Sequence, residues 1–285
     1  MKPVYRETAR AFDDVAPYYD AIYGPQGNAV MSWMRRENLA LLKDTFPRDS
    51  CLLELGCGSG EEAIALAKAG RRVLATDLSP KMAARTQAKA RAADLDDRLT
   101  VAAMPASGIT MLQPGTSFDG AYASFGVLNC EPLLSRLGAA LARLVRPGGA
   151  FVCSVMGRTC PFEIAWFLLH GRPDRALRRW RPGWQQASVA GRETAEGDGT
   201  VPVSVATRYL TVRTLRETFS PSFALEHTQS LPLLLPPPYL DALFRRHGDL
   251  FARLEPLERR LRRRWPWRLW GDHVILVLRR ASPAT

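Results

Sequence analysis

Short apolar runs and amphipathic stretches alternate along residues 49–155. Residues 50–55 and 71–76 form compact apolar runs typical of buried strands, whereas 61–68 and 80–93 carry apolar residues at helical spacing. The same alternation predicts strands at 98–103, 118–124 and 149–155 and a helix at 133–145. Because strands that alternate with helices pair in parallel, we predict an α/β fold whose sheet is doubly wound and mostly parallel, with helices on both faces.

The pattern changes after Gly157, where we predict two insertions into this core. Residues 1–157 form the predicted core domain. Residues 158–210 form an inserted cap segment with an aromatic helix at 162–170, an Arg-rich stretch at 172–181 and a Gly-rich polar loop at 191–200. Residues 231–270 form a second cap segment, which opens with Pro236-Pro237-Pro238 and carries an Arg-rich helix at 249–264.

Core-like patterning returns between and after the insertions. Residues 211–230 predict a helix at 211–219, whose Thr214 and Glu217 fit a capping box, and a strand at 223–230. Residues 271–285 contain a final strand at 273–279. These additions predict a seven-stranded sheet in which we expect the last strand to run antiparallel.

The composition is that of an ordinary globular protein, with 46% hydrophobic and 24% charged residues in a chain of 285. The start lacks the apolar stretch of a signal peptide, and no run approaches the roughly 20 apolar residues of a membrane span. We therefore expect a soluble, cytoplasmic protein. Five cysteines without a C-x-x-C pair suggest reduced thiols, and we expect no metal site.

The net charge of +11 is concentrated in the second half of the chain. Residues 1–157 hold 18 Lys and Arg against 16 Asp and Glu (18 − 16 = +2), whereas residues 158–285 hold 21 against 12 (21 − 12 = +9). The basic excess therefore belongs to the segments around the predicted core and not to the core itself.

A glycine-rich segment, Glu54-Leu55-Gly56-Cys57-Gly58-Ser59-Gly60, joins the first predicted strand to the first helix. Glycines at such a turn let a ligand approach the backbone N–H groups closely. The dinucleotide pattern G-x-G-x-x-G would need glycine where Glu61 stands, and no Walker-type Lys-Ser/Thr follows. The acidic Glu54 suits a ligand that bears an ammonium and a sulfonium better than a phosphate.

Asp77 ends the second predicted strand, about 20 residues after the glycines, where a carboxylate can accept hydrogen bonds from both hydroxyls of a ribose. The two signals together indicate adenosine without phosphates as the ligand.

These residues resemble the motifs of class I S-adenosylmethionine-dependent methyltransferases. The resemblance rests on 53–60, on Ala75-Thr76-Asp77-Leu78-Ser79-Pro80-Lys81-Met82, on Phe118-Asp119 and on 144–149, and it covers roughly residues 10–157 and the last strand. It implies S-adenosylmethionine as cofactor, a Rossmann-like fold and methyl transfer as the activity.

The resemblance also assigns residues to the cofactor. Gly56, Cys57, Gly58, Ser59 and Gly60 would line it, Glu54 would contact its amino-acid end, Asp77 the ribose, Leu78 and Met82 the adenine, and Ser124 and Phe125 the methionine portion. The acidic residue that the family often has after the third strand is replaced here by Ala103-Met104-Pro105. We therefore expect backbone groups beside Met104 to recognise adenine.

Tyr18-Tyr19 lies in a segment, 12–20, that resembles the part of these enzymes that folds over the cofactor. The aromatic face of Tyr19 could close the pocket around the sulfonium, because aromatic faces attract cations. Simple packing of both tyrosines is the alternative.

The sequence names no catalytic residue. Glu163, His170 and His247 are candidate bases in the cap segments, but isolated residues of these types are more often surface or packing residues. Methyl transfer to a well-placed nucleophile depends largely on positioning and desolvation, so an absent base is no objection.

The Arg-rich run 259–264, followed by Trp265, Trp267 and Trp270, has three readings: a solvated helix face, a helix in peripheral contact with a membrane, or a nucleic-acid patch. Its arginines could also bind an anionic small substrate. Many methyltransferases that act on the amino groups of bases have an Asn/Asp-Pro-Pro-Tyr motif after the fourth strand. Here that strand leads into Ala123-Ser124-Phe125-Gly126, which argues against nucleic acid as acceptor. The similar Pro237-Pro238-Tyr239 lies far downstream, in the second cap segment. No Pro-Cys nucleophile occurs either, because Cys130 follows Asn129.

We therefore predict methyl transfer to an O, N or C nucleophile of a small-molecule or lipid-like acceptor, as in secondary metabolism or lipid and quinone modification. An RNA methyltransferase that uses the basic second half is one alternative. A protein that binds the cofactor without transferring its methyl group is another.

Overall fold

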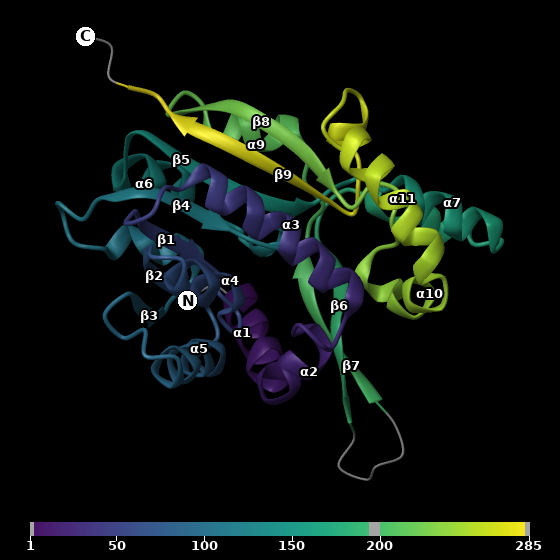
Figure 1. Cartoon of the computed structure of the whole chain (residues 1–285), viewed down its shortest axis with the longest axis horizontal. Coiled ribbons are helices and arrows are strands. Elements are labelled where there is room, and N and C mark those ends of the chain that lie inside the picture. The colour runs from purple at the N-terminus through teal and green to yellow at the C-terminus, as the bar shows by residue number, and fades with distance from the viewer. Residues whose placement is uncertain (1–2, 194–199, 283–285) are drawn as a thin grey trace.

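The computed structural model describes residues 3–193 and 200–282 of the chain and is built on one seven-stranded sheet (Figure 1). The strands of this sheet are β1 (Cys51–Leu55), β2 (Arg72–Asp77), β3 (Leu99–Ala103), β4 (Phe118–Ala123), β5 (Val145–Met156), β8 (Phe223–Leu231) and β9 (His273–Arg280).

The strand order is β3-β2-β1-β4-β5-β9-β8. The first five strands pair in parallel, and β9 runs antiparallel to both β5 and β8. The predicted doubly wound sheet with an antiparallel last strand is confirmed. The order reverses between β1 and β4, and a crevice forms at the carboxyl ends of strands that diverge in this way.

Helices cover both faces of the sheet, because successive residues of a strand point to opposite faces. Leu52 of β1 belongs to the core beneath the first group of helices, and Leu53 to the core beneath the second. On the first face lie α3 (Ala29–Thr45), α4 (Glu61–Lys68) and α5 (Pro80–Ala92); on the second lie α6 (Leu134–Leu144) and α9 (Val212–Phe219).

Local signals place several of these helices where the sequence predicts them. Ser79 caps α5 by accepting a hydrogen bond from the amide of Met82, and Pro80 occupies the first turn, where its missing N–H costs nothing. The cap of α9 differs from the prediction: Thr211 accepts the bond from the amide of Thr214, and Glu217 pairs with Arg213. The helix begins one turn earlier than a capping box at Thr214 would allow.

Three N-terminal helices precede the first strand: α1 (Pro3–Val15), α2 (Tyr19–Tyr23) and α3. Helix α3 lies along one face of the sheet, whereas α1 and α2 lie beside the carboxyl ends of the strands, near the start of a hairpin that extends away from the sheet (Figure 1). The hairpin strands are β6 (Gln185–Glu193) and β7 (Thr200–Thr207), which pair antiparallel.

This hairpin corrects the loop predicted at 191–200, since Gly191–Glu193 belong to β6 and Thr200 to β7, while 194–199 lie outside the described residues. Its strands pack against α1, and Val189 and Val203 meet Phe12 of that helix in a small third core. Contacts from a distant segment supply the partner that a short polar hairpin needs.

The two predicted cap segments meet at one end of the molecule (Figure 1). The ring of Phe162 in the first segment is tilted against that of Phe251 in the second, with 6.4 Å between their centres, and Phe167 stacks parallel to Tyr239. Their helices are α7 (Pro161–Leu169), α8 (Pro173–Ala176), α10 (Asp241–Arg246) and α11 (Gly248–Leu261). Helix α11 is shorter than predicted and contains Pro256.

The Arg/Trp-rich run lies at the end of α11. Arg259 and Arg262 form ion pairs with Glu37 of α3, so part of this run fastens the second cap segment to the core. Trp265 is 74% exposed. None of the helices in the described part of the chain has the length and apolar character that a bilayer span requires.

Candidate functional site

A cavity of about 640 Å³ lies at the carboxyl ends of β1, β2 and β4. Its floor is the crevice where the strand order reverses, and its walls come from α1, α2, the β6–β7 hairpin and both cap segments. The volume falls within the 300–1,000 Å³ typical of small-molecule sites.

Backbone conformation explains the glycines after β1. Gly56, Gly58 and Gly60 all have positive φ, a region that other residues rarely adopt. A Cβ on Gly56 would come within 2.4 Å of Val127, and one on Gly60 within 2.5 Å of Thr86. A Cβ on Gly58 would instead lie 3.8 Å from the ring of Tyr19, in ordinary contact distance. Gly56 and Gly60 are thus required by packing, whereas Gly58 leaves room between the loop and Tyr19.

Asp77 reaches the same loop from the end of β2. Its carboxylate accepts hydrogen bonds from the amides of Gly58 and Ser79, both at 2.8 Å. Burial raises the pKa of this carboxyl to about 6 despite these two bonds. Asp77 lines the cavity, and each of its oxygens retains a lone pair for a ligand hydroxyl.

Glu54 lies one layer below the cavity and does not line it. The side chain is 1% exposed, and its Oε2 has no hydrogen-bond partner. Burial raises the pKa of Glu54 well above its ordinary value, and the nearby Glu62 adds to this effect. Glu54 thus lies behind the residues that line the cavity, and its contact with the amino-acid end of a ligand stays a prediction.

Arg35 and Glu62 form an ion pair that lines the cavity, and neither residue was predicted from the sequence. The Arg35 guanidinium donates to Glu62 at 2.8 Å and to the carbonyl of Tyr23 at 2.8 Å. It also lies 5.9 Å from the ring centre of Phe125. No local motif marks Arg35, which is brought to the site by the packing of α3 against α4.

The structure places most of the predicted cofactor residues around the cavity. Those that line it are Tyr19, Gly56, Cys57, Gly58, Ser59, Asp77, Leu78, Ser124 and Phe125. Those outside its lining are Glu54, Gly60, Met82 and Met104.

Met82 and Met104 are held elsewhere by packing. Met82 is fully buried against Val15 and Ala16, and Met104 packs against the second core while its amide donates to the carbonyl of Asp77. Pro105 and Ala106, which follow Met104, reach the cavity instead. Of the tyrosine pair, Tyr19 lines the cavity, whereas Tyr18 packs against the small core at the end of α1.

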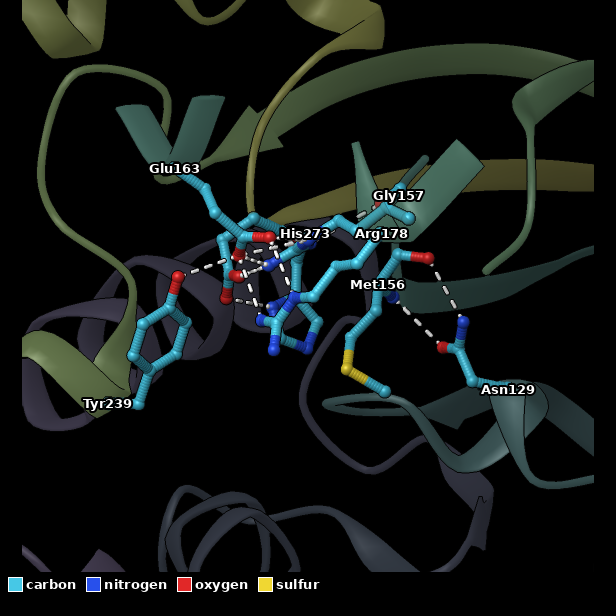
Figure 2. Close-up of polar contacts among 9 residues, drawn as sticks. Asn129, Met156, Gly157, Glu163, Arg178, Tyr239 and His273 are labelled. Carbon is cyan, nitrogen blue, oxygen red and sulfur yellow. Dashed lines mark hydrogen bonds and ion pairs between the residues drawn. The ribbon is translucent and has the colours of Figure 1, made fainter. Parts of the chain in front are cut away.

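The three candidate bases do not line the cavity. His170 and His247 are exposed at helix ends. Glu163 is buried and accepts hydrogen bonds from Arg178, Arg179 and the hydroxyl of Tyr239, as Figure 2 shows for Arg178 and Tyr239. Glu163 is therefore the centre of an ion-pair cluster, although three of its partners do line the cavity.

This cluster, formed by Glu163, Arg178, Arg179, Asp272 and His273, connects the first cap segment to the start of β9. Arg179 lies between the two carboxylates, at 2.6 Å from Glu163 and 2.5 Å from Asp272. Burial alone would raise the pKa of both carboxyl groups, but the positive charge of Arg179 outweighs it and lowers them. Two carboxylates and two guanidinium groups leave the cluster with no net charge when the imidazole is neutral.

Cys160, Glu163 and Asp272 have ligand atoms within 4.8 Å of one another, a spacing that could suit a metal ion. The guanidinium of Arg179 already supplies the positive charge between the two carboxylates. Burial raises the pKa of the Cys160 thiol, which disfavours the thiolate that a metal would need. The five cysteines are free.

Two members of this cluster, Asp272 and His273, line the cavity, and neither was predicted from the sequence. Their signal in the sequence is Gly271-Asp272-His273, which leads into the apolar strand predicted at 273–279. An adjacent Asp and His at the start of a core strand would have justified naming them as a candidate pair.

Comparison with known proteins identifies the central part of the chain. Residues 52–149 match the methyltransferase domain family. An uncharacterized protein of Mycobacterium bovis is 34% identical over 105 residues, which are 36% of this chain and 35% of that protein. An uncharacterized protein of Mycobacterium tuberculosis is 28% identical over 170 residues, 57% of each chain. The matched segments thus span between about a third and somewhat over half of the curated relatives' length.

Solved structures share the fold over nearly the whole chain. The CcbJ methyltransferase from Streptomyces caelestis is 19% identical with a TM-score of 0.63, over 97% of this chain and 99% of that one. The [4+2]-cyclase SpnF is 15% identical with a TM-score of 0.62, over 99% and 97% of the two chains. At these identities the similarity is one of fold.

Proposed function

We propose, from the premise that the chain carries a class I S-adenosylmethionine-dependent methyltransferase domain, that it transfers a methyl group to an uncharged small-molecule or lipid-like acceptor. The observation that carries this proposal is a single cavity in which the open loop at Gly58 and the carboxylate of Asp77 face a second region lined by the cap segments and the hairpin.

The residues present fit the adenosyl group of this cofactor. The space beside Gly58 has no side chain of the loop in it, Asp77 retains free acceptor positions, and Leu78, Pro105 and Ala106 offer apolar contact beside them. When bound, S-adenosylmethionine supplies an electrophilic methyl group on a sulfonium. The ring of Tyr19, which lies 3.8 Å from the place of a Cβ on Gly58, would border this end of the site.

Opposite charges are available for the amino-acid end of the cofactor. Arg35 uses two of its donor groups on Glu62 and Tyr23, which leaves further N–H groups for a carboxylate. Glu62 lines the cavity beside it and can accept from an ammonium. We assign to this pair the role that the sequence resemblance gave to Glu54, with the buried Glu54 supporting the loop from below.

The second region of the cavity, lined by the cap segments and the hairpin, is the acceptor region, and its lining favours an uncharged molecule. Its lining combines apolar and aromatic side chains with neutral polar groups: Phe12, Met31, Cys130, Met156, Val189, Val205, Thr207, Tyr209, Pro238 and Tyr239. The charges of Arg178 and Arg179 are matched by Glu163 and Asp272. An anionic acceptor would thus compete with carboxylates already in place, whereas an apolar acceptor with a few polar groups fits.

The basic second half gives little support to RNA as acceptor. Many of its arginines form ion pairs within the protein, including Arg245 with Asp241, Arg259 and Arg262 with Glu37, and Arg279 with Glu226. Phosphate contacts would require those guanidinium groups to be free. We therefore place the acceptor among small molecules, as in secondary metabolism or lipid and quinone modification.

A second candidate function is cofactor binding without methyl transfer. The observation in its favour is the similarity in fold to a protein whose structure is described as a [4+2]-cyclase. This candidate predicts binding of S-adenosylmethionine without formation of S-adenosylhomocysteine with any acceptor.

The test is isothermal titration of S-adenosylmethionine and S-adenosylhomocysteine into the wild type and into Asp77→Ala, with NADH as a control ligand. We expect both ligands to bind the wild type and the variant to bind each roughly 10- to 100-fold more weakly, because two hydrogen bonds to a charged acceptor are lost. As a control, Asp96→Ala replaces an exposed aspartate that does not line the cavity, and this variant should bind both ligands like the wild type.

Binding of NADH without binding of S-adenosylmethionine would overturn the cofactor assignment. If the cofactor binds, a panel of alcohols, phenols, amines and RNA, assayed for S-adenosylhomocysteine, separates methyl transfer to a small molecule from the other two candidates.

A further inference from the structure

We propose that His273 is the general base of this methyl transfer, that Asp272 positions its imidazole, and that the acceptor presents a hydroxyl group to it. This inference rests on the proposed function and adds to it a catalytic residue and a class of acceptor.

The position of His273 is set by the end of the sheet. It is the first residue of β9 and pairs with Met156 of β5 and with Leu231 of β8. Figure 2 shows His273 grouped with Glu163 and Arg178, and Met156 and Asn129 to one side of them. The Asn129 side chain holds the backbone of Met156 through two hydrogen bonds. Because the strand is paired on both sides, the imidazole is carried by a rigid element.

The imidazole lies between the two regions of the cavity. Its ring stands edge-on to that of Phe125, with 5.9 Å between ring centres. Phe125 follows β4 at the reversal of the strand order, and the Arg35 guanidinium lies 5.9 Å from its ring. On its other side the imidazole is next to Asp272, whose partner Arg179 lines the cavity. A base at this place would face the acceptor atom that meets the cofactor's methyl group.

Asp272 determines which nitrogen of the imidazole carries the proton. Nδ1 of His273 lies 2.9 Å from Oδ2 of Asp272. Burial would raise the pKa of Asp272, but the charge of Arg179 outweighs it and keeps the carboxyl ionised. An ionised carboxylate only accepts hydrogen bonds, so Nδ1 must be the donor and Nε2 must hold the lone pair.

Asp272 is itself held firmly. Arg179 donates to Oδ1 at 2.5 Å and to the backbone carbonyl of Asp272 at 2.9 Å, and it is fixed in turn by Glu163. In the part of the chain that the structure describes, no hydrogen bond engages Nε2 of His273. The arrangement of a carboxylate, an oriented imidazole and a free ring nitrogen is that of a general base.

Other titratable groups around the cavity are less suited to this role. Glu131 accepts from the hydroxyl of Tyr5 and from the amides of Ser107 and Leu133. Burial raises the pKa of the Cys130 thiol and, together with Glu163, the pKa of Tyr239. The charged and titratable groups that surround His273 in the cluster are Asp272, Arg179, Arg178, Glu163, Tyr209 and Tyr239.

The step that His273 would assist is balanced by a single proton transfer. The acceptor oxygen forms a bond to the methyl carbon, the carbon–sulfur bond breaks with its electron pair going to sulfur, and the hydroxyl proton passes to Nε2. A neutral alcohol or phenol needs this removal of a proton, because it is a weak nucleophile at neutral pH. The absence of net charge in the cluster suits a neutral acceptor of this kind.

The first test compares His273→Gln with His170→Gln, which makes the same change at an exposed position outside the cavity. Both variants and the wild type are titrated with S-adenosylmethionine and then assayed for S-adenosylhomocysteine with a panel of phenols and alcohols. We expect cofactor affinity within twofold in all three, and a kcat lower by about 10²- to 10⁴-fold in His273→Gln alone.

The second test does not depend on finding an acceptor. The ¹⁵N chemical shifts of the His273 ring at pH 8.5, assigned by difference with His273→Gln, report its tautomer. We expect a protonated Nδ1 and a bare Nε2. A proton on Nε2 would overturn the proposal. The tautomer therefore tests the role of His273 even when no compound of the panel is methylated.

The outcomes separate the two proposals. If S-adenosylmethionine does not bind the wild type, the proposed function is contradicted. Binding together with methyl transfer to a hydroxyl at equal rates in the wild type and His273→Gln would leave that function standing and overturn the role of His273.

Discussion

We expect the carboxyl of Asp77 to make cofactor binding depend on pH. Its pKa of about 6 lies above the value near 3.9 of an exposed Asp, so its contribution to stability is present at acidic pH and is lost as the pH rises through 6. The ionised form can accept hydrogen bonds from ribose hydroxyls at both oxygens, whereas protonation turns one oxygen into a donor. We expect the affinity for S-adenosylmethionine to fall by up to about tenfold per pH unit below 6.

Titration calorimetry from pH 5 to 8 checks this expectation. Asp77→Asn should bind more weakly throughout and show no such dependence. An affinity of the wild type that is flat from pH 5 to 8 would contradict the role of Asp77.

The glycines of the loop should separate packing from ligand access. Gly56→Ala combines a positive φ with a 2.4 Å approach to Val127, and we expect it to lower the free energy of unfolding by about 2–4 kcal/mol. Gly58→Ala meets only ordinary contact and should cost about 1–2 kcal/mol from its φ alone, yet weaken cofactor binding because the methyl group occupies the open space.

Urea unfolding and titration of both variants measure the two effects. Equal destabilisation by the two changes, or full affinity in Gly58→Ala, would show that the loop does not divide its tasks in this way.

At the scale of elements, the Glu163 cluster joins α7, the turn at Arg178–Trp180, the segment at Tyr239 and the start of β9. Glu163→Gln would leave buried guanidinium charge without its partner, and we expect a loss of about 3–5 kcal/mol in the free energy of unfolding. The lowered pKa of Glu163 implies that this contribution is present above its unfolded value near 4.3 and is lost as the pH falls.

Denaturant unfolding at pH 7 tests this, with Glu217→Gln as the control. Glu217 forms an exposed pair with Arg213 within α9, and its replacement should lower the free energy of unfolding far less than Glu163→Gln does. If the two variants were equally stable, the cluster would not hold these elements together.

For the whole molecule, a ligand that contacts the sheet edge, the N-terminal helices and the cap segments should stabilise the fold as a unit. At 100 times its Kd, S-adenosylmethionine adds about 2.7 kcal/mol to the free energy of unfolding. For a chain of this size we expect Tm to rise by roughly 5–8 °C. Scanning fluorimetry measures the shift, which at the same ligand concentration should be reduced to about half or less in Asp77→Ala. A similar shift with NADH would point to nonspecific stabilisation.

Much of the core could be predicted from the sequence, because its signals are local. The apolar run at 50–55 and the helical spacing at 61–68 correspond closely to β1 and α4. The β6–β7 hairpin was not predicted, because its strands depend on contact with α1, about 180 residues earlier in the chain.

The same distinction holds for the site. The sequence by itself determined the loop at Gly58 and the carboxylate of Asp77, because a glycine turn and an acidic strand end are read within a few adjacent residues. Only the tertiary structure decided that Glu54 lies beneath the cavity, that Arg35 enters it and that Asp272 orients His273. Those positions depend on which helix packs on which strand, and packing between distant segments leaves no periodic trace in the sequence.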